Sequence, residues 1–149
     1  MAIPDLAGPE PLGAARRAVA AELLAEAART GGVDLVARGV SMGAALPDGA
    51  RLRVESGRRY RAGDVLVFLN GTGQFVAHRM LGRIPGPRGW RFVMRGDAAP
   101  AADGLVPPAR VIGRVAGGEA DPRLWRVPLA DRVRAWIGFL RYLLSRAAA

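Results

Sequence analysis

The sequence predicts a mainly β protein: a mostly antiparallel β body with an amphipathic helix at each end. Short runs rich in Val, Leu, Ile and Phe recur across residues 33–116, and turn-forming Gly, Pro and Asp residues separate them. Both ends of the chain instead carry apolar residues at helical spacing. A chain of 149 residues suffices for one domain with a buried core, so residues 1–149 are expected to form a single domain.

The first helix is expected over about residues 11–30. Prolines precede this Ala-, Leu- and Glu-rich segment and Gly31-Gly32 follows it, which is the usual punctuation of a helix. Four apolar residues keep helical spacing and predict the face that packs on the body. They are Val19, Leu23, Leu24 and Ala27.

Six segments of the β body are expected to be strands. They are Asp34–Ala37, Arg51–Glu55, Asp64–Leu69, Gln74–Ile84, Trp90–Arg95 and Arg110–Ala116. Asn70-Gly71-Thr72-Gly73 predicts a hairpin, because Asn and Gly tolerate positive φ, and the segment 85–89 joins the next pair of strands. The Ala- and Pro-rich segment 97–108 is expected to be a disordered loop.

The last helix is expected over about residues 128–146. Its apolar residues fall on one stripe, while its arginines fall mostly elsewhere. The stripe consists of Leu129, Val133, Trp136, Ile137, Leu140, Leu143 and Leu144. We favour a helix that caps the β core. The alternative is a helix in a membrane interface, where Trp, Leu and Arg are the usual composition.

The composition limits the partners and cofactors. The net charge is +9 and every one of the 22 basic residues is arginine, which favours contact with phosphate or an anionic membrane. These arginines are scattered, however, so a compositional bias is the favoured explanation and no specific nucleic acid partner is expected. With no cysteine, one histidine and scattered carboxylates, we expect no disulfide, no metal site and no organic cofactor.

Neither a signal peptide nor a membrane span is apparent in the sequence. The first 18 residues lack the apolar core of a signal peptide, and every apolar run is too short to cross a bilayer. A cytoplasmic or membrane-peripheral protein is therefore expected.

The scarcity of His, Ser and Lys restricts the available chemistry. A serine becomes a good nucleophile only beside a base, and His78 is the one conventional base in a chain without lysine. Of the serines, Ser145 lies in the predicted last helix and Ser56 beside a polar turn, whereas Ser41 lies in a Gly-flanked segment between strands. These residues alone leave a structural role for His78 open.

Four segments, in order, resemble the conserved boxes of type I signal peptidases. They are Gly39-Val40-Ser41-Met42 with Leu46-Pro47-Asp48-Gly49, then Arg61-Ala62-Gly63-Asp64-Val65-Leu66-Val67-Phe68, then Phe75-Val76-Ala77-His78-Arg79-Met80, and last Phe92-Val93-Met94-Arg95-Gly96-Asp97 with Asp103 and Val111-Ile112-Gly113-Arg114-Val115. The resemblance covers about residues 36–115. It is to the endoplasmic-reticulum and archaeal type, in which histidine replaces the bacterial lysine. Family members normally carry transmembrane helices ahead of the first box, where this chain has an Ala-rich helix.

The resemblance implies a signal-peptidase-like body and a role for each matched residue. Ser41 would be the nucleophile, His78 the general base, and Asp103, rather than Asp97, the acid that orients the histidine. Asp97 resembles a structural carboxylate that binds nearby backbone donors. The Ser41 N–H would bind the oxyanion, and Gly39 and Met42 would be the neighbouring oxyanion or binding positions. Gly39 stands where some bacterial relatives use a serine hydroxyl as a second donor, so that donor is missing.

These roles imply a serine endopeptidase that cleaves a leader or signal-like peptide, with a peptide or precursor protein as its partner. An extended substrate is expected to add as a strand beside the Ser41 segment. Two alternatives remain: a non-catalytic peptide-binding module on the same fold, and a DNA-associated autopeptidase of the SOS-repressor type. The second is disfavoured because a single helix before the β body is too little for a helix-turn-helix.

Overall fold

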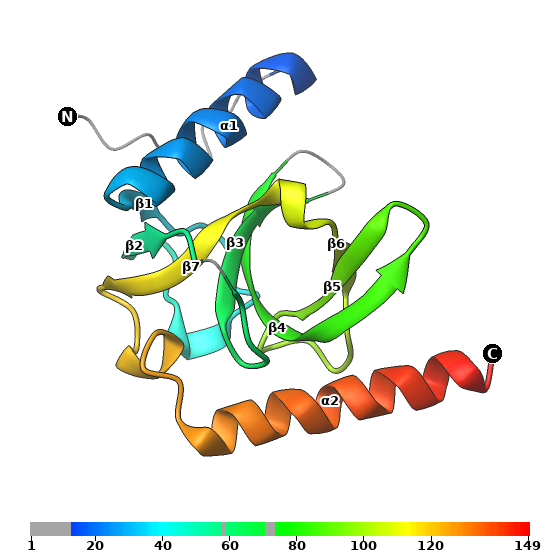
Figure 1. Ribbon diagram of the computed structural model, residues 1–149. Coiled ribbons are helices and arrows are strands. Elements are labelled where there is room, and N and C mark those ends of the chain that lie inside the picture. Colours follow the sequence, from blue (N-terminus) through cyan, green and yellow to red (C-terminus); the bar gives the residue numbers. More distant parts are fainter. Residues whose placement is uncertain (1–12, 58, 71–73) are drawn as a thin grey trace.

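One sheet of seven strands dominates the computed structural model, which describes residues 13–57, 59–70 and 74–149. The strands are β1 (Val33–Val36), β2 (Arg51–Glu55), β3 (Val65–Leu69), β4 (Phe75–Gly86), β5 (Gly89–Arg95), β6 (Gly104–Val106) and β7 (Val111–Gly118). Their order in the sheet is β1-β2-β7-β3-β4-β5-β6, and neighbouring strands are antiparallel. Helices α1 (Ala14–Thr30) and α2 (Leu129–Ala147) lie on opposite sides of this body (Figure 1). The predicted mainly β fold with a helix at each end is confirmed.

Each of the six expected strands is present, with bounds within a few residues of the prediction, and one more strand was not expected. β6 lies inside the segment 97–108, so the prediction of a disordered loop there is wrong. This three-residue strand pairs with β5, which supplies a free edge that composition cannot reveal. Residues 71–73 of the expected hairpin lie outside the described residues. At its flank, the Asn70 N–H donates to the Gln74 carbonyl at 2.8 Å.

Strand β4 changes its partner strand along its length, and this change leaves one edge of its first residues without a partner among the described strands. Residues 75–79 pair with β3, whereas residues 79–86 pair with β5, with an irregularity between Met80 and Gly82. Among the described strands, none pairs with the other edge of residues 75–78. β1 is the end strand of the sheet and likewise pairs only with β2 in the described part of the chain.

Helix α1 covers β1, β2 and β7, but its packing face differs from the predicted one. Leu24 and Ala28 are buried and Ala27 packs against the same core, whereas Val19 and Leu23 are exposed. The prediction is therefore wrong for Val19 and Leu23. Apolar residues surround this Ala-rich helix on several sides, so spacing alone did not define one buried face.

Helix α2 packs on the body through a different side from its apolar stripe. Ala135 is buried, and Phe139 and Tyr142 pack with it against Leu81 and Ile84. The helix therefore packs on the β core, as favoured, but its apolar stripe does not make this contact, because all seven stripe residues are exposed large hydrophobics. Close approach at Gly82 explains the choice of face, because a Cβ there would lie 2.6 Å from the Phe139 ring. Within the described residues, no helix has the length and hydropathy needed to cross a membrane.

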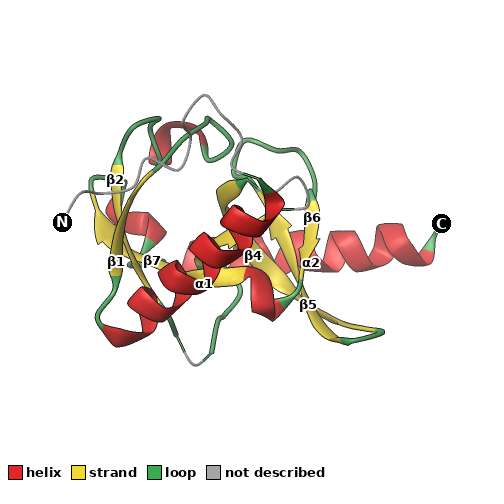
Figure 2. Cartoon of the chain, turned by 90° about the horizontal axis from the view of Figure 1, so that it is seen from above, coloured by secondary structure: helices red, strands yellow, loops and turns green. Residues whose placement is uncertain are grey.

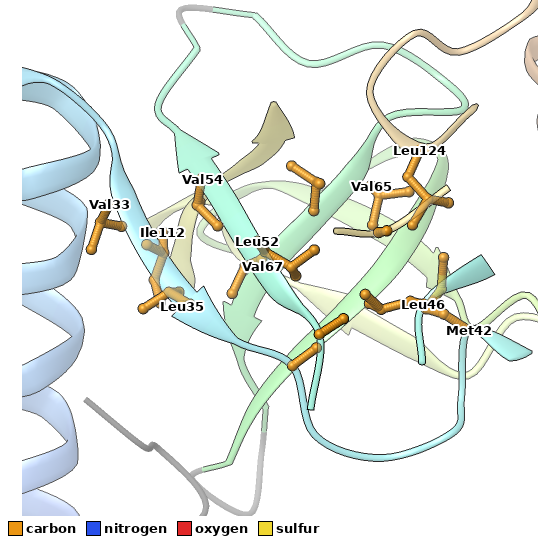
Figure 3. Packing of buried hydrophobic residues seen from close by; sticks show 14 of the residues in the cluster. Val33, Leu35, Met42, Leu46, Leu52, Val54, Val65, Val67, Ile112 and Leu124 are labelled. Atoms are coloured by element: carbon orange, nitrogen blue, oxygen red, sulfur yellow. The ribbon is translucent and has the colours of Figure 1, made fainter. Parts of the chain in front are cut away.

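The largest core cluster joins α1, β1, β2, β3 and β7 to the segment after β1. Its residues include Met42 and Leu46, which pack near Leu52, Val67 and Leu124 (Figure 3). Burial of side chains of this size stabilises the fold by about 1.5–3 kcal/mol each. Met42 is 2% exposed, so the residue after Ser41 is anchored in the core.

Candidate active site

Ser41 lies in a sharply turned segment between β1 and the 3-10 helix η1 (Gly43–Ala45). Gly39 and Gly43 both have positive φ, of 92° and 61°, a conformation that residues with a Cβ rarely adopt. The Gly39 N–H donates to Asp48 Oδ1 at 3.0 Å, and the Gly43 N–H donates to the Val40 carbonyl at 2.9 Å. With Met42 buried below it, this turn holds the exposed Ser41 at the surface.

The loop of residues 96–103, between β5 and β6, packs against the backbone of Ser41 and forms a hydrogen bond with it. The Ala98 N–H donates to the Ser41 carbonyl at 2.9 Å. Gly96 lies so close that a Cβ on it would be 2.6 Å from the Ser41 carbonyl oxygen and 3.2 Å from the Ser41 Cβ. The absence of a side chain at residue 96 therefore permits this approach.

The same loop supplies the carboxylate that contacts the histidine. His78 Nδ1 lies 3.2 Å from Asp103 Oδ1, and Asp103 Oδ2 accepts the Gly96 N–H at 3.0 Å. The Asp103 N–H donates to the Met94 carbonyl, which fixes the aspartate at the start of β6. The His78 ring packs edge-on against Phe68, with centroids 5.8 Å apart. Because Nδ1 faces the carboxylate, Nε2 is the imidazole nitrogen left for a substrate or a nucleophile.

Asp97 binds an arginine and does not contact His78. Arg79 Nε and Nη2 donate to the two Asp97 carboxylate oxygens at 2.8 and 2.7 Å, and Arg79 Nη1 donates to the Gly63 carbonyl. Asp97 is thus a structural carboxylate, although its partner is a guanidinium and not the backbone donors that were expected. Burial opposes the charged form of Arg79, but the hydrogen bond and the negative charges of Asp97, Asp131 and Asp64 outweigh it and raise the pKa.

One loop thus connects the two candidate catalytic side chains. Gly96 contacts Ser41 and donates to Asp103, which contacts His78, while the ion pair of Asp97 with Arg79 ties the loop to β4. Within the described part of the chain, Ser41 Oγ forms no hydrogen bond with His78. Catalytic hydrogen bonds are often long without substrate and shorten when substrate binds.

The backbone next to Ser41 has donors available for a ligand. Among the described residues, no acceptor binds the N–H of Ser41 or of Met42. Two successive N–H groups beside a nucleophile are the arrangement that stabilises an oxyanion. Gly39, in contrast, has its N–H engaged by Asp48 and has no side chain to add a donor.

A small apolar pocket opens beside Ser41. It has a volume of about 50 Å³ and is lined by β1, the Ser41 turn, β3 and the first residues of β4. Its apolar walls come mainly from Leu35, Met42, Leu52, Val67, Phe75 and Ala77. Pockets for drug-sized ligands span about 300–1,000 Å³, so this one has room for a single small side chain. The unpaired edges of β1 and of β4 residues 75–78 contribute to its walls.

The described residues offer no metal-binding group. Within residues 13–57, 59–70 and 74–149, no cluster of three or more His, Cys, Asp or Glu side chains could hold a metal ion. The site offers a hydroxyl, an imidazole–carboxylate pair, backbone donors and an apolar pocket, which are groups that can serve nucleophilic chemistry. No protein-family model matches this chain, and no curated protein matches it either.

Sequence reasoning assigned no role to several residues that build this site. Arg79 and Gly96 lie inside the recognised segments, but their contacts join residues 18 and 55 positions apart in the chain. Ala98 and the pocket wall at Leu35 and Phe75 gave no signal at all, since small and apolar residues there are typical of loops and strands.

Proposed function

We propose that this protein is a serine endopeptidase in which Ser41 is the nucleophile, His78 the general base and Asp103 the residue that orients the histidine. The observation that carries the proposal is the loop 96–103, which contacts the backbone of Ser41 and also supplies the carboxylate that binds His78. Ser41, which lines the small pocket, and the His78–Asp103 pair come from distant segments of the chain, and this loop contacts both. The sequence resemblance to signal peptidases supports the same roles.

Acylation follows from this geometry. Ser41 Oγ attacks the carbonyl carbon of the scissile bond, and its proton passes to His78 Nε2. Asp103 at Nδ1 holds the required tautomer and stabilises the imidazolium that forms. The N–H groups of Ser41 and Met42 stabilise the oxyanion, and one such donor contributes about 3 kcal/mol to transition-state binding. When the C–N bond breaks, His78 returns the proton to the leaving amine and an ester remains on Ser41.

Deacylation uses the same groups with water as the nucleophile. His78 Nε2 removes a proton from water as its oxygen attacks the ester carbonyl, and the same donors stabilise the second oxyanion. Collapse of this intermediate breaks the bond to Ser41 Oγ, which regains its proton from His78. No metal or organic cofactor takes part in these steps.

The pocket and the strand edges support an extended peptide as the substrate class. An extended peptide would lie between the free edges of β1 and of β4 residues 75–78, with backbone hydrogen bonds providing affinity. One small apolar side chain beside the scissile bond would enter the pocket of about 50 Å³. A leader or signal-like peptide with small residues before the cleavage point fits both requirements.

Cleavage of a defined peptide pool tests the proposal. Peptides with Ala, Val, Leu, Phe or Asp next to the scissile bond would be incubated with the wild type, and products identified by mass spectrometry. We expect cleavage after small residues, its loss in Ser41→Ala and His78→Ala, and its retention in the matched control Ser145→Ala, whose hydroxyl binds the Tyr142 carbonyl on α2. Cleavage that persists in Ser41→Ala would refute the assigned nucleophile.

A non-catalytic peptide-binding module is the second candidate. The observation that favours it is the absence of a hydrogen bond between Ser41 Oγ and His78 in the described structure. This candidate predicts that peptides bind to the wild type and Ser41→Ala with equal affinity and leave intact. Calorimetry beside the cleavage assay therefore separates the two functions.

A further inference from the structure

The outer surface of α2 is an apolar stripe that the fold does not use. Its seven residues are between 36% and 78% exposed, and they include Trp136 and Leu140. A different side of the helix makes the contacts with β4 and β5 through Ala135, Phe139 and Tyr142. A large, contiguous apolar surface on a folded protein indicates an interaction site.

The stripe is long and accessible. It runs from Leu129 to Leu144, or about 22 Å at 1.5 Å per residue. Seen from above, the C-terminal end of α2 extends beyond the strands, the β4–β5 hairpin included (Figure 2). Beyond Tyr142 every residue of the helix is exposed. The stripe is therefore accessible to solvent along its whole length.

The charges beside the stripe select the kind of surface. Arg134 and Arg141, seven residues apart, share one side of the helix and flank the Ile137 edge of the stripe, and both are exposed. The helix has four arginines and one acidic residue, Asp131, which is buried and paired with Arg123 and Arg134; Arg132 pairs with Asp64, and Arg141 and Arg146 form no ion pair with a described residue. The exposed part of α2 is therefore apolar and cationic.

We propose that α2 docks this protein on an anionic lipid surface, with its apolar stripe in the headgroup–acyl boundary. A helix with Trp and Leu on one face and Arg beside it is the composition of interfacial helices. Charge complementarity favours anionic lipid over a second copy of this chain, because two copies would bring two cationic helices together, each on a protein with a net charge of +9. This inference goes beyond the peptidase proposal and does not depend on it.

Vesicle flotation tests the proposal with two lipid compositions, phosphatidylcholine alone and phosphatidylcholine mixed with phosphatidylglycerol. We expect the wild type to float with the anionic vesicles and to remain unbound with the neutral ones. Leu140→Glu should weaken partitioning at least about tenfold, because it places a charge in the apolar boundary. The matched control Leu23→Glu, at an exposed leucine of α1, should float like the wild type.

A second pair of variants separates local from overall charge. Arg141→Glu and Arg16→Glu change the net charge equally, and both arginines are exposed. Only Arg141→Glu should weaken flotation, by about fivefold or more. Circular dichroism verifies that each variant is folded. Equal loss in both variants, no flotation of the wild type, or a wild-type dimer that Leu140→Glu dissociates in sedimentation equilibrium would each overturn the proposal.

Discussion

Replacement of Gly96 by alanine tests the loop that connects Ser41 with His78. The new Cβ would lie 2.6 Å from the Ser41 carbonyl oxygen, closer than real Cβ atoms approach other atoms. The oxygen belongs to the backbone, so relief requires a shift of either the Ser41 turn or the loop 96–103. Overpacking of this kind costs about 1–3 kcal/mol of folding free energy.

The functional loss should exceed the stability loss. A displacement of about 1 Å at a catalytic group lowers the rate by about 100-fold. The assay is the rate at which a fluorophosphonate probe labels Ser41, measured beside urea unfolding of the same sample. Gly104→Ala is the matched control, since a Cβ there meets no atom within 4 Å. If Gly96→Ala reacts with the probe at the wild-type rate, the loop does not position Ser41 and the reasoning is wrong.

Three further substitutions address the other contacts. Asp103→Asn should lower the labelling rate by on the order of 10³ to 10⁴ while the urea midpoint changes little, because the histidine loses the acceptor that fixes its tautomer; a near-normal rate would exclude Asp103 from the mechanism. Asp97→Ala should destabilise the fold by about 3 kcal/mol in urea unfolding, because it leaves the buried Arg79 charge unpaired. The exposed pair of Asp34 with Arg53 is its control, and Asp34→Ala should cost at most about 1 kcal/mol; equal effects would contradict the buried-pair argument. Gly82→Ala should lower the free energy of unfolding by about 1–3 kcal/mol through a clash with Phe139, whereas Gly31→Ala, with open space around it, should not; an unchanged urea midpoint for Gly82→Ala would show that α2 tolerates displacement.

The strands could be predicted from the sequence because local signals define them. Val65–Phe68 is a buried apolar run between turn residues, and Arg51–Glu55 alternates buried and less buried side chains, as a strand should. Gly86 and Gly89, which pair at the end of β4 and β5, similarly enclose a two-residue turn. Strand β6 was missed because three residues in an Ala- and Pro-rich segment have no periodicity. Its pairing with β5 depends on tertiary structure.

The helices show a different limit of sequence reasoning. Helical spacing identified the apolar stripe of α2 correctly, but spacing cannot tell which side of a helix the body covers. The absence of a side chain at Gly82 on β4 determines which side of α2 packs on the body, because it lets the Phe139 side approach closely. The stripe consequently remains exposed, and we propose that it contacts a lipid surface.

The side chains of the candidate site could be predicted from the sequence, but the contacts that hold them in place could not. Scarcity of serine and histidine, together with the order of the recognised segments, singled out Ser41, His78 and Asp103. The contacts that hold them depend on chain segments far apart in sequence. The ion pair of Arg79 with Asp97 and the close approach of Gly96 to Ser41 are examples, and a single sequence contains no record of such proximity.

The most direct test of the account is intact-protein and peptide mass spectrometry after treatment with a fluorophosphonate probe. We expect one adduct on the wild type, located at Ser41, no adduct on Ser41→Ala or His78→Ala, and a normal adduct on Ser145→Ala. An adduct on a different serine, or labelling of Ser41 that is unchanged in His78→Ala, would contradict the assignment of an activated nucleophile.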